Sequence, residues 1–283
     1  MSGVAGGDRI HRKDFDCVVH NYLEKVLKPY IPDVEWKISG SYHNPNKEDF
    51  GDIDLIVTIP STDKKQTKVE LQKYLESLSD SLIVPFKSEK YKGKRSYNSG
   101  EIVTVLFPQQ NGKTVQIDNI ISLSSQETDF KVNFLDLPAE KQGLILGLVK
   151  VSCIQEDPKL IFQRLDIPLL PYGKNQEYEF NLSAQNLTLR LNTYEEGTFK
   201  EIERQEIWKS NNWNDVVKLL NNFDLNKSFE DLLDDLVSMD SRSRNRIFGI
   251  FKSMITVKSG EVGTPKGLAK ENALHLIKNK LNL

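Results

Sequence analysis

The stretch that most restricts the fold is residues 52–59, Asp-Ile-Asp-Leu-Ile-Val-Thr-Ile. It is rich in aliphatic and β-branched residues, which is typical of a buried strand. Because side chains alternate along a strand, Asp52 and Asp54 project from one face while Ile53 points to the other. Two carboxylates side by side repel each other, and a divalent cation would turn that repulsion into attraction.

The patterns around this stretch predict one compact α/β unit in the first half of the chain. Helix periodicity covers residues 13–28 and 64–79, and strand patterns cover 34–38, 82–86, 101–107 and 114–121. Asn-Gly between the last two strands is a strong hairpin signal. The order of the strands in the sheet cannot be read from the sequence.

The second half carries mostly helical patterns. We expect an apolar helix at 138–154, a β-hairpin formed by 177–182 and 187–194, and helices at 196–210, 213–221, 228–238, 244–257 and 266–281. The expected domains are therefore an α/β domain at 1–130, which the resemblance described below makes the catalytic one, and a mostly helical domain at 131–283 that completes the cleft.

Composition excludes several classes of protein. Among 283 residues, 38 are Lys or Arg and 40 are Asp or Glu, so the chain is no histone-like polycation. The apolar run at 144–149 is far shorter than the ~20 residues of a membrane span, and the start of the chain has no apolar leader core. Cys17 and Cys153 lie in apolar helical patterns and are expected to be reduced core thiols. We expect a soluble, cytoplasmic protein without a membrane partner.

A third carboxylate and a glycine-serine turn add to the acid pair. Asp118 interrupts the strand pattern at 114–121. Mg²⁺ prefers one or two carboxylates plus substrate phosphates, and acids on adjacent strands could hold two such ions. Gly40 and Ser41 follow the strand pattern at 34–38 and offer backbone N–H groups and a hydroxyl to phosphate.

Each feature also has a plainer interpretation. Asp52 and Asp54 alone suit a solvated strand end, and a glycine-serine pair is common in loops. Asp118 would be merely exposed if its strand lay at the sheet edge. The combination, with ten residues between Ser41 and Asp52, favours a site for phosphate and metal.

In this combination the sequence resembles the polymerase-β-like nucleotidyltransferase superfamily, over roughly residues 34–121 and the preceding helix. The resemblance implies an α+β fold, with a polymerase-β-type sheet, flanking helices and a mostly helical C-terminal domain. It also implies an enzyme that transfers a nucleoside monophosphate from a nucleoside triphosphate, such as ATP, to a hydroxyl group and releases pyrophosphate.

The resemblance assigns roles to individual residues. Asp52 and Asp54 would ligate two Mg²⁺ ions, or Mn²⁺, and Asp118 would ligate the ion that activates the acceptor. Gly40 and Ser41 would contact the triphosphate.

Lys150 sits inside an apolar run. It resembles the lysine that several of these enzymes place on the helix after the third acid to touch the triphosphate. A lysine at the solvent edge of a core helix is the plainer interpretation.

Two basic segments bear on the acceptor. The first contains Lys92, Lys94 and Arg95 among tyrosines and glycines, which suits a nucleic-acid backbone with stacked bases and suits a solvated loop equally well. The second contains Arg242, Arg244 and Arg246. Phosphate contacts and pairing with the acidic segment at 224–240 explain it equally well.

The basic segments make a polynucleotide 3′ end, in particular RNA, the first expected acceptor. Nucleotidylation of a protein or a small molecule is the alternative. A third possibility, of a different class, is a non-catalytic module that binds a nucleotide or a protein.

Overall fold

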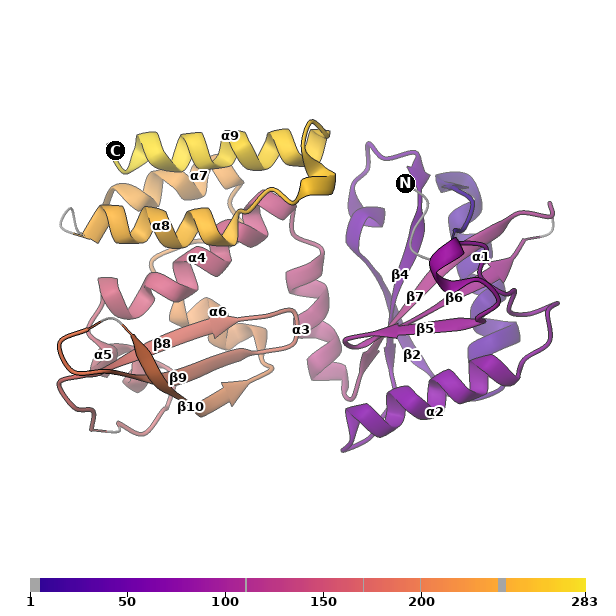
Figure 1. The fold of residues 1–283 in the computed structure, drawn as a ribbon, viewed down its shortest axis with the longest axis horizontal. Helices are drawn as coiled ribbons and strands as arrows, with labels where there is room; N and C mark the ends of the chain where they lie inside the picture. Colours follow the sequence, from indigo (N-terminus) through magenta and orange to yellow (C-terminus); the bar gives the residue numbers. More distant parts are fainter. Residues whose placement is uncertain (1–5, 110, 170, 199, 239–242) are drawn as a thin grey trace. The chain divides into compact units, whose positions relative to one another are not determined.

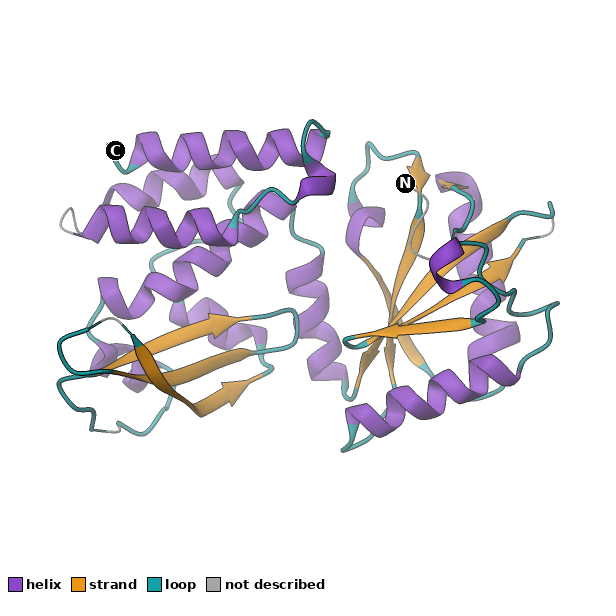
Figure 2. Cartoon of the chain, viewed as in Figure 1, coloured by secondary structure: helices purple, strands orange, loops and turns teal. Residues whose placement is uncertain are grey.

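The computed structural model describes residues 6–109, 111–169, 171–198, 200–238 and 243–283. The chain divides into two compact units, Met1–Asp136 and Leu137–Leu283, whose helices and strands are drawn in Figures 1 and 2. The first unit is built on a five-stranded sheet, and the second combines helices with a three-stranded sheet. The α+β class predicted from the sequence is confirmed.

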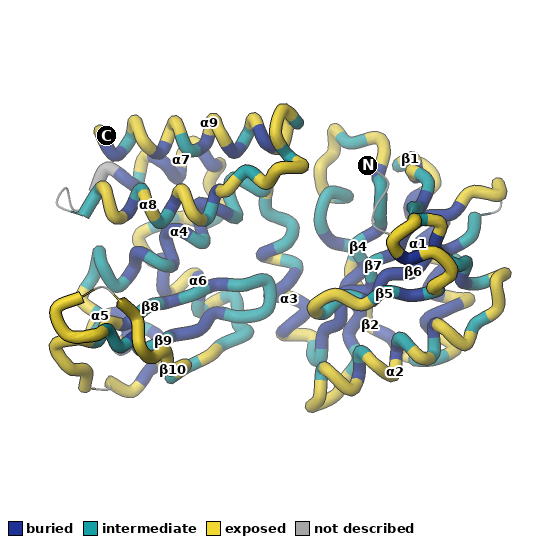
Figure 3. Tube along the Cα trace, viewed as in Figure 1, coloured by how far each residue is buried: buried dark blue, intermediate teal, exposed yellow. Residues whose placement is uncertain are grey.

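The sheet of the first unit has the strand order β2-β4-β7-β6-β5. Its central parallel pair joins β4 to β7, and the other neighbours are antiparallel. The strands are β2 (Glu35–Ser39), β4 (Asp52–Thr58), β5 (Ser96–Ser99), β6 (Ile102–Pro108) and β7 (Thr114–Ser122). Strands β4, β6 and β7 are buried along most of their length (Figure 3), because they have aliphatic side chains on both faces.

Helices pack against this sheet. They are α1 (Arg12–Tyr22), its continuation η1 (Leu23–Leu27), α2 (Lys64–Ser77) and α3 (Ser125–Leu135). The turns η2 (Gly40–His43) and η3 (Glu89–Tyr91) and the short pair β1 (Ile10–His11) and β3 (Asp49–Phe50) complete the unit. Helix α2 begins at Asp63, whose carboxylate accepts the N–H of Gln66 at 2.9 Å.

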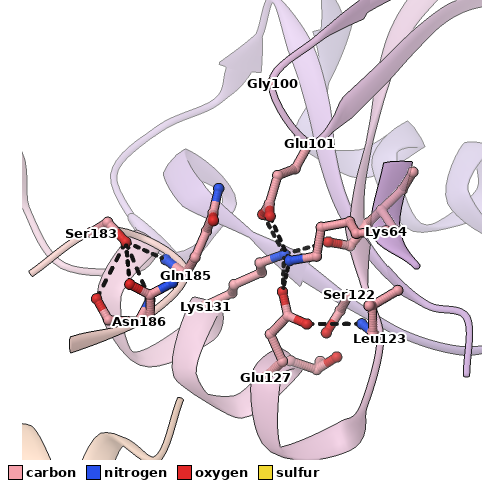
Figure 4. A network of polar contacts seen from close by, with 12 residues as sticks. Lys64, Gly100, Glu101, Ser122, Leu123, Glu127, Lys131, Ser183, Gln185 and Asn186 are labelled. Carbon is pink, nitrogen blue, oxygen red and sulfur yellow. Dashed lines mark hydrogen bonds and ion pairs between the residues drawn. The ribbon is translucent and has the colours of Figure 1, made fainter. Parts of the chain in front are cut away.

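A buried ion cluster anchors the end of β7 (Figure 4). Lys131, with 1% of its side chain exposed, binds Glu101 at 2.7 Å and Glu127 at 2.9 Å, and donates to the carbonyl of Ile121. Lys64 binds the same two glutamates. Two ammonium groups and two carboxylates therefore neutralise one another where water is scarce, and they tie α2 and α3 to the sheet.

The second unit places helices around the antiparallel sheet β10-β9-β8. Its strands are β8 (Gln176–Leu182), β9 (Leu187–Tyr194) and β10 (Glu201–Ser210). Its helices are α4 (Ala139–Gln155), α5 (Pro158–Arg164), α6 (Trp213–Leu219), α7 (Phe229–Asp234), η4 (Asp235–Ser238), α8 (Arg244–Met254), η6 (Ser259–Glu261) and α9 (Pro265–Lys280). No helix among the described residues has the length and apolarity needed to cross a membrane.

Two secondary-structure predictions are wrong. Residues 196–210, predicted as helix, contain β10, which pairs with β9 from Glu201 onward. Most of this edge strand is exposed, so no apolar alternation marked it as a strand. Residues 82–86 form no strand, and only Val84 makes an isolated bridge, to Leu106.

The cysteine prediction also needs correction. Both cysteines are free thiols, but Cys17 is exposed on α1 and Cys153 is only partly buried. Cys17 lies between the buried positions Phe15 and Val18, on the side of the helix that faces water. The helix is present as predicted, but Cys17 lies outside its buried apolar face.

Candidate active site

Four side chains from neighbouring strands form a row across the sheet. The register pairs Ser39 with Asp54, Asp54 with Asp118, and Asp118 with Thr104. Residues paired in register project to the same face, so Asp54 and Asp118 are direct neighbours. Asp52 lies two residues before Asp54 on the same face. The structure thus brings the three predicted carboxylates to one side of the sheet.

Asp118 is held from two directions. The hydroxyl of Thr104 donates to its Oδ1 at 2.6 Å, and the Nε2 of Gln116 donates to both carboxylate oxygens at 3.1 Å. Strand β7 lies inside the sheet, so the alternative of an exposed edge strand does not apply. Gln116 could have been noticed in the sequence, since it precedes Asp118 by two residues on the same strand face. Nothing in the sequence marked Thr104.

Asp54 and Asp118 lie side by side and are partly buried, and the charge of Lys47 offsets only part of the repulsion on Asp54. Burial, followed by the charges of Asp52 and Asp118, raises the pKa of Asp54 to about 7. Burial also raises the pKa of Asp118 to about 6, although the Thr104 hydrogen bond acts in the opposite direction. A carboxylate whose ionisation is this costly gains stability from any added cation.

The donor set suits a hard divalent cation that is shared with a phosphate ligand. Among the described residues, no group of three or more His, Cys, Asp or Glu side chains is arranged to hold a metal ion by itself. Mg²⁺ usually takes one or two carboxylates and completes its coordination with water and substrate phosphates. Asp54 and Asp118 offer such a pair. Beside them, the buried Ser39 hydroxyl finds no hydrogen-bond partner within the described ranges.

Gly40 begins the turn η2 directly against this acid pair. Its φ is +74°, and a Cβ there would lie 2.6 Å from Oδ2 of Asp54. Its N–H donates to Oδ1 of Asp136 at 2.9 Å, and Oδ2 of Asp136 lies 3.2 Å from Nε2 of His43. A backbone donor that serves a carboxylate can equally serve a phosphate oxygen. Asp136 comes from the end of α3, so no sequence pattern linked it to this turn.

Gly40→Ala tests whether the turn must approach Asp54 this closely. The left-handed φ costs an alanine about 1–2 kcal/mol, and the added methyl group must also displace the Asp54 carboxylate. We expect reduced stability in urea unfolding together with loss of ATP binding in Mg²⁺. Gly112→Ala is the matched control, because its φ is +76° with no atom within 4 Å of the added Cβ. Equal ATP affinity in the two variants would contradict the close approach.

Ser41 contacts a residue that the sequence did not single out. Its Oγ accepts a hydrogen bond from Nζ of Lys47 at 2.6 Å. Burial lowers the pKa of Lys47, whereas the nearby charge of Asp52, and more weakly that of Asp54, raises it. This lysine lies in the polar spacer between the glycine-serine turn and β4, where nothing distinguished it from a solvated loop residue.

Lys150 belongs to the second unit. It forms an ion pair with Glu179 at 2.9 Å and lines a cavity of about 560 Å³ within that unit. The described contacts therefore give this lysine a structural partner on β8, and its assignment to the triphosphate stays a prediction.

The basic segment of the first unit is heterogeneous. Lys92 lies 3.6 Å from Glu89 and both side chains are exposed. Lys94 is also exposed. Arg95 donates instead to the carboxylate of Asp80 and to the carbonyl of Leu78. Two of these three cations are thus at the surface, while Arg95 braces the fold.

The arginine cluster of the second unit is partly engaged. Arg242 lies outside the described residues. Arg244 begins α8, and Arg246 pairs with Glu177 at 3.0 Å. Arg246 thus pairs outside the acidic segment at 224–240, and Asp234 of that segment binds Lys280 of α9 instead.

No protein-family model matches the sequence, and no curated protein matches it either. Solved structures do resemble it. Polymerase beta of Leishmania infantum in a ternary gap complex has 15% identity and a TM-score of 0.41, over 76% of this chain and 68% of that chain. The Cid1 poly(U) polymerase bound to MgGTP has 16% identity and a TM-score of 0.30, over 62% and 58%. The polymerase core of TRAMP has 14% identity and a TM-score of 0.28, over 55% and 50%.

All three are structures of polymerases. At these identities and TM-scores the likeness carries no conclusion about this chain.

Proposed function

We propose that this protein is a nucleotidyltransferase that uses a nucleoside triphosphate and releases pyrophosphate. The observation that supports this most directly is the in-register pair Asp54 and Asp118, which is partly buried, with Asp54 directly against the Gly40 turn. A pair of partly buried carboxylates next to a backbone N–H group is suited to holding a cation and a phosphate chain together.

In the proposed reaction, an acceptor hydroxyl group gives up its proton to Asp118 or to water, and its oxygen forms a bond to the α-phosphorus. The bond from that phosphorus to the pyrophosphate oxygen breaks. Divalent cations bound to Asp52, Asp54 and Asp118 would neutralise the phosphates and lower the pKa of the acceptor hydroxyl. The Gly40 N–H and the Ser41 hydroxyl would hold the phosphates. Asp118, fixed by its hydrogen bonds, would orient the acceptor.

The direct test is incubation of the full chain with each α-³²P-labelled nucleoside triphosphate, Mg²⁺ or Mn²⁺, and cellular RNA, protein or metabolites. Label transferred to one class of acceptor, with pyrophosphate released, would support the proposal and identify the acceptor. Binding of triphosphate without any labelled product would instead favour a non-catalytic nucleotide-binding module.

We further propose a polynucleotide 3′ end as the acceptor, with a protein or a small molecule as the alternative. The support is the exposed pair Lys92 and Lys94. The neighbouring Tyr91 is buried and packs with Tyr97 in a small apolar cluster, so it is the two cations that suit the phosphates of a polynucleotide.

The charge reversal Lys92→Glu with Lys94→Glu tests this acceptor. Each lost phosphate contact should reduce the slope of log K against log salt by about 0.7 for a single strand, so the double variant should bind labelled oligo(A) with a visibly flatter salt dependence. Arg95 stays unchanged because it braces the fold. The control reverses the exposed Lys13 and Lys25. A slope that both double variants reduce equally, or that neither reduces, would favour the protein or small-molecule acceptor.

A further inference from the structure

The loop between η2 and β4 carries a lysine at the junction of the two halves of the candidate site. Lys47 donates to Ser41 on one side and interacts with the charges of Asp52 and Asp54 on the other. Its Nζ also lies 5.1 Å from the centre of the Phe50 ring, which limits where the ammonium group can go. A half-buried cation is thus fixed between the phosphate-binding turn and the acid pair.

Arg12 fixes the loop that carries this lysine. Its Nε donates to the carbonyl of Lys47 at 2.8 Å, and its Nη2 donates to the carbonyls of Tyr42 at 3.0 Å and Asn44 at 2.6 Å. Its guanidinium also lies over the rings of Tyr42, at 5.3 Å, and Phe50, at 5.1 Å. One side chain therefore binds three carbonyl groups along a six-residue stretch of a loop with little regular structure of its own. A lysine could not reproduce this planar fork.

The charges of the site explain why a cation is placed there. Bound divalent cations would balance Asp52, Asp54 and Asp118, but a triphosphate that enters the site would bring its own negative charge. A lysine fixed beside the Ser41 hydroxyl can donate to a phosphate oxygen in the same place where it now donates to Ser41.

We propose that Lys47 binds the triphosphate of the substrate nucleotide and that Arg12 is the positioning residue that holds Lys47 in place. This inference rests on the proposed function, since it names a further contact in the same site. The inference predicts that loss of Lys47 weakens the binding of the triphosphate but does not weaken the binding of a divalent cation. Without Lys47, the triphosphate loses a charged donor, whereas a cation no longer competes with an ammonium group for Asp52 and Asp54.

The experiment compares Lys47→Met with the full wild-type chain by calorimetry with ATP in Mg²⁺, and by electron paramagnetic resonance with Mn²⁺ alone. We expect ATP affinity to fall about tenfold or more, as for a lost charged hydrogen bond, while Mn²⁺ affinity is unchanged or higher. Lys47→Arg should restore most of the ATP affinity. Lys37→Met, which removes the ion pair between Lys37 on β2 and Asp129 on α3, is the control and should leave both affinities unchanged.

Arg12→Met should reproduce the loss of ATP affinity and, unlike Lys47→Met, should also speed hydrogen exchange at residues 41–47. Lys13→Met, which changes an exposed residue of the same helix, is its control. Parallel loss of ATP and Mn²⁺ affinity in Lys47→Met, or no loss of ATP affinity, would overturn the inference. A different result would overturn only the proposed function. In that case Lys47→Met would change the ATP and Mn²⁺ affinities as expected, but the wild-type chain would form no labelled product, and the assignment of Lys47 would stand.

Discussion

Replacing Asp54 by Asn should abolish nucleotidyl transfer while making the protein more stable. The amide keeps the shape of the carboxylate but removes the charge that would bind the metal, so we expect turnover to fall about a thousandfold or more. The charge is costly in the folded chain, because burial and the neighbouring acids raise the pKa of Asp54 to about 7 from an ordinary 3.8. Loss of activity should therefore come with a gain in stability.

The pH dependence gives the sign of that gain. Because the folded pKa is above the unfolded value, ionised Asp54 destabilises the fold at neutral pH, and this cost disappears as the pH falls below about 4. Asp54→Asn should raise the free energy of unfolding by about 2–4 kcal/mol at pH 8 and by almost nothing at pH 3.5. Urea titrations at both pH values measure this difference. Asp49→Asn, an exposed acid on β3, is the control. Near-normal turnover with Mg²⁺ would disprove the metal assignment.

Replacing Lys131 by Met should strongly destabilise the protein, in contrast to the stabilising Asp54→Asn. The variant leaves Glu101 and Glu127 with Lys64 as the one cation of the cluster that still binds them, while Glu127 keeps the N–H of Leu123. Breaking a buried ion network in this way costs about 3–5 kcal/mol. Hydrogen exchange at β4 and β7 measures the loss of stability of the first unit by itself. A measurement on the whole chain would combine the unfolding of both units. Lys65→Met, on the exposed side of α2, should cost less than about 0.5 kcal/mol.

Acid should remove the same stabilisation in the wild type. Burial favours the neutral form of Glu127, but hydrogen bonds from Lys64 and Lys131 outweigh it, and the pKa of Glu127 is lowered from 4.5. A carboxyl group whose pKa is lower in the folded than in the unfolded chain stabilises the fold at a pH above the unfolded pKa. This stabilisation is lost as the pH falls through the folded pKa. Stability should therefore decline below pH 4.5 in the wild type, and less steeply in Lys131→Met. Equal acid sensitivity in both would show that the cluster is not responsible.

The parts of the fold that the sequence predicted best are those with local signals. Strand β4 is buried on both faces after Asp54, and the hairpin of β6 and β7 forms around the Asn-Gly turn. Both arise from strand alternation and turn chemistry, which act over a few residues. The charged strand β10 had no such signal, because its stability comes from pairing with β9 rather than from apolar burial.

The candidate site divides in the same way. Gly40, Ser41, Asp52, Asp54 and Asp118 were marked by residue type and spacing. Residues whose contribution depends on distant chain segments were not. Thr104 reaches Asp118 only through strand register, and Asp136 reaches Gly40 across 96 positions of sequence. Such contacts appear only once the strand order is known, and that order was not readable from the residues.

The strand order also determines when the site can exist. Strand β7 lies between β4 and β6, although it is made after both. A growing chain that has reached only β6 already contains Asp52 and Asp54, yet the central strand of its sheet is missing. The β6–β7 hairpin can form quickly from neighbouring residues, whereas docking β7 against β4 closes a long loop and is slow. Incomplete chains therefore lack the paired carboxylates. The candidate site forms only when β7 inserts between β4 and β6 and completes the core.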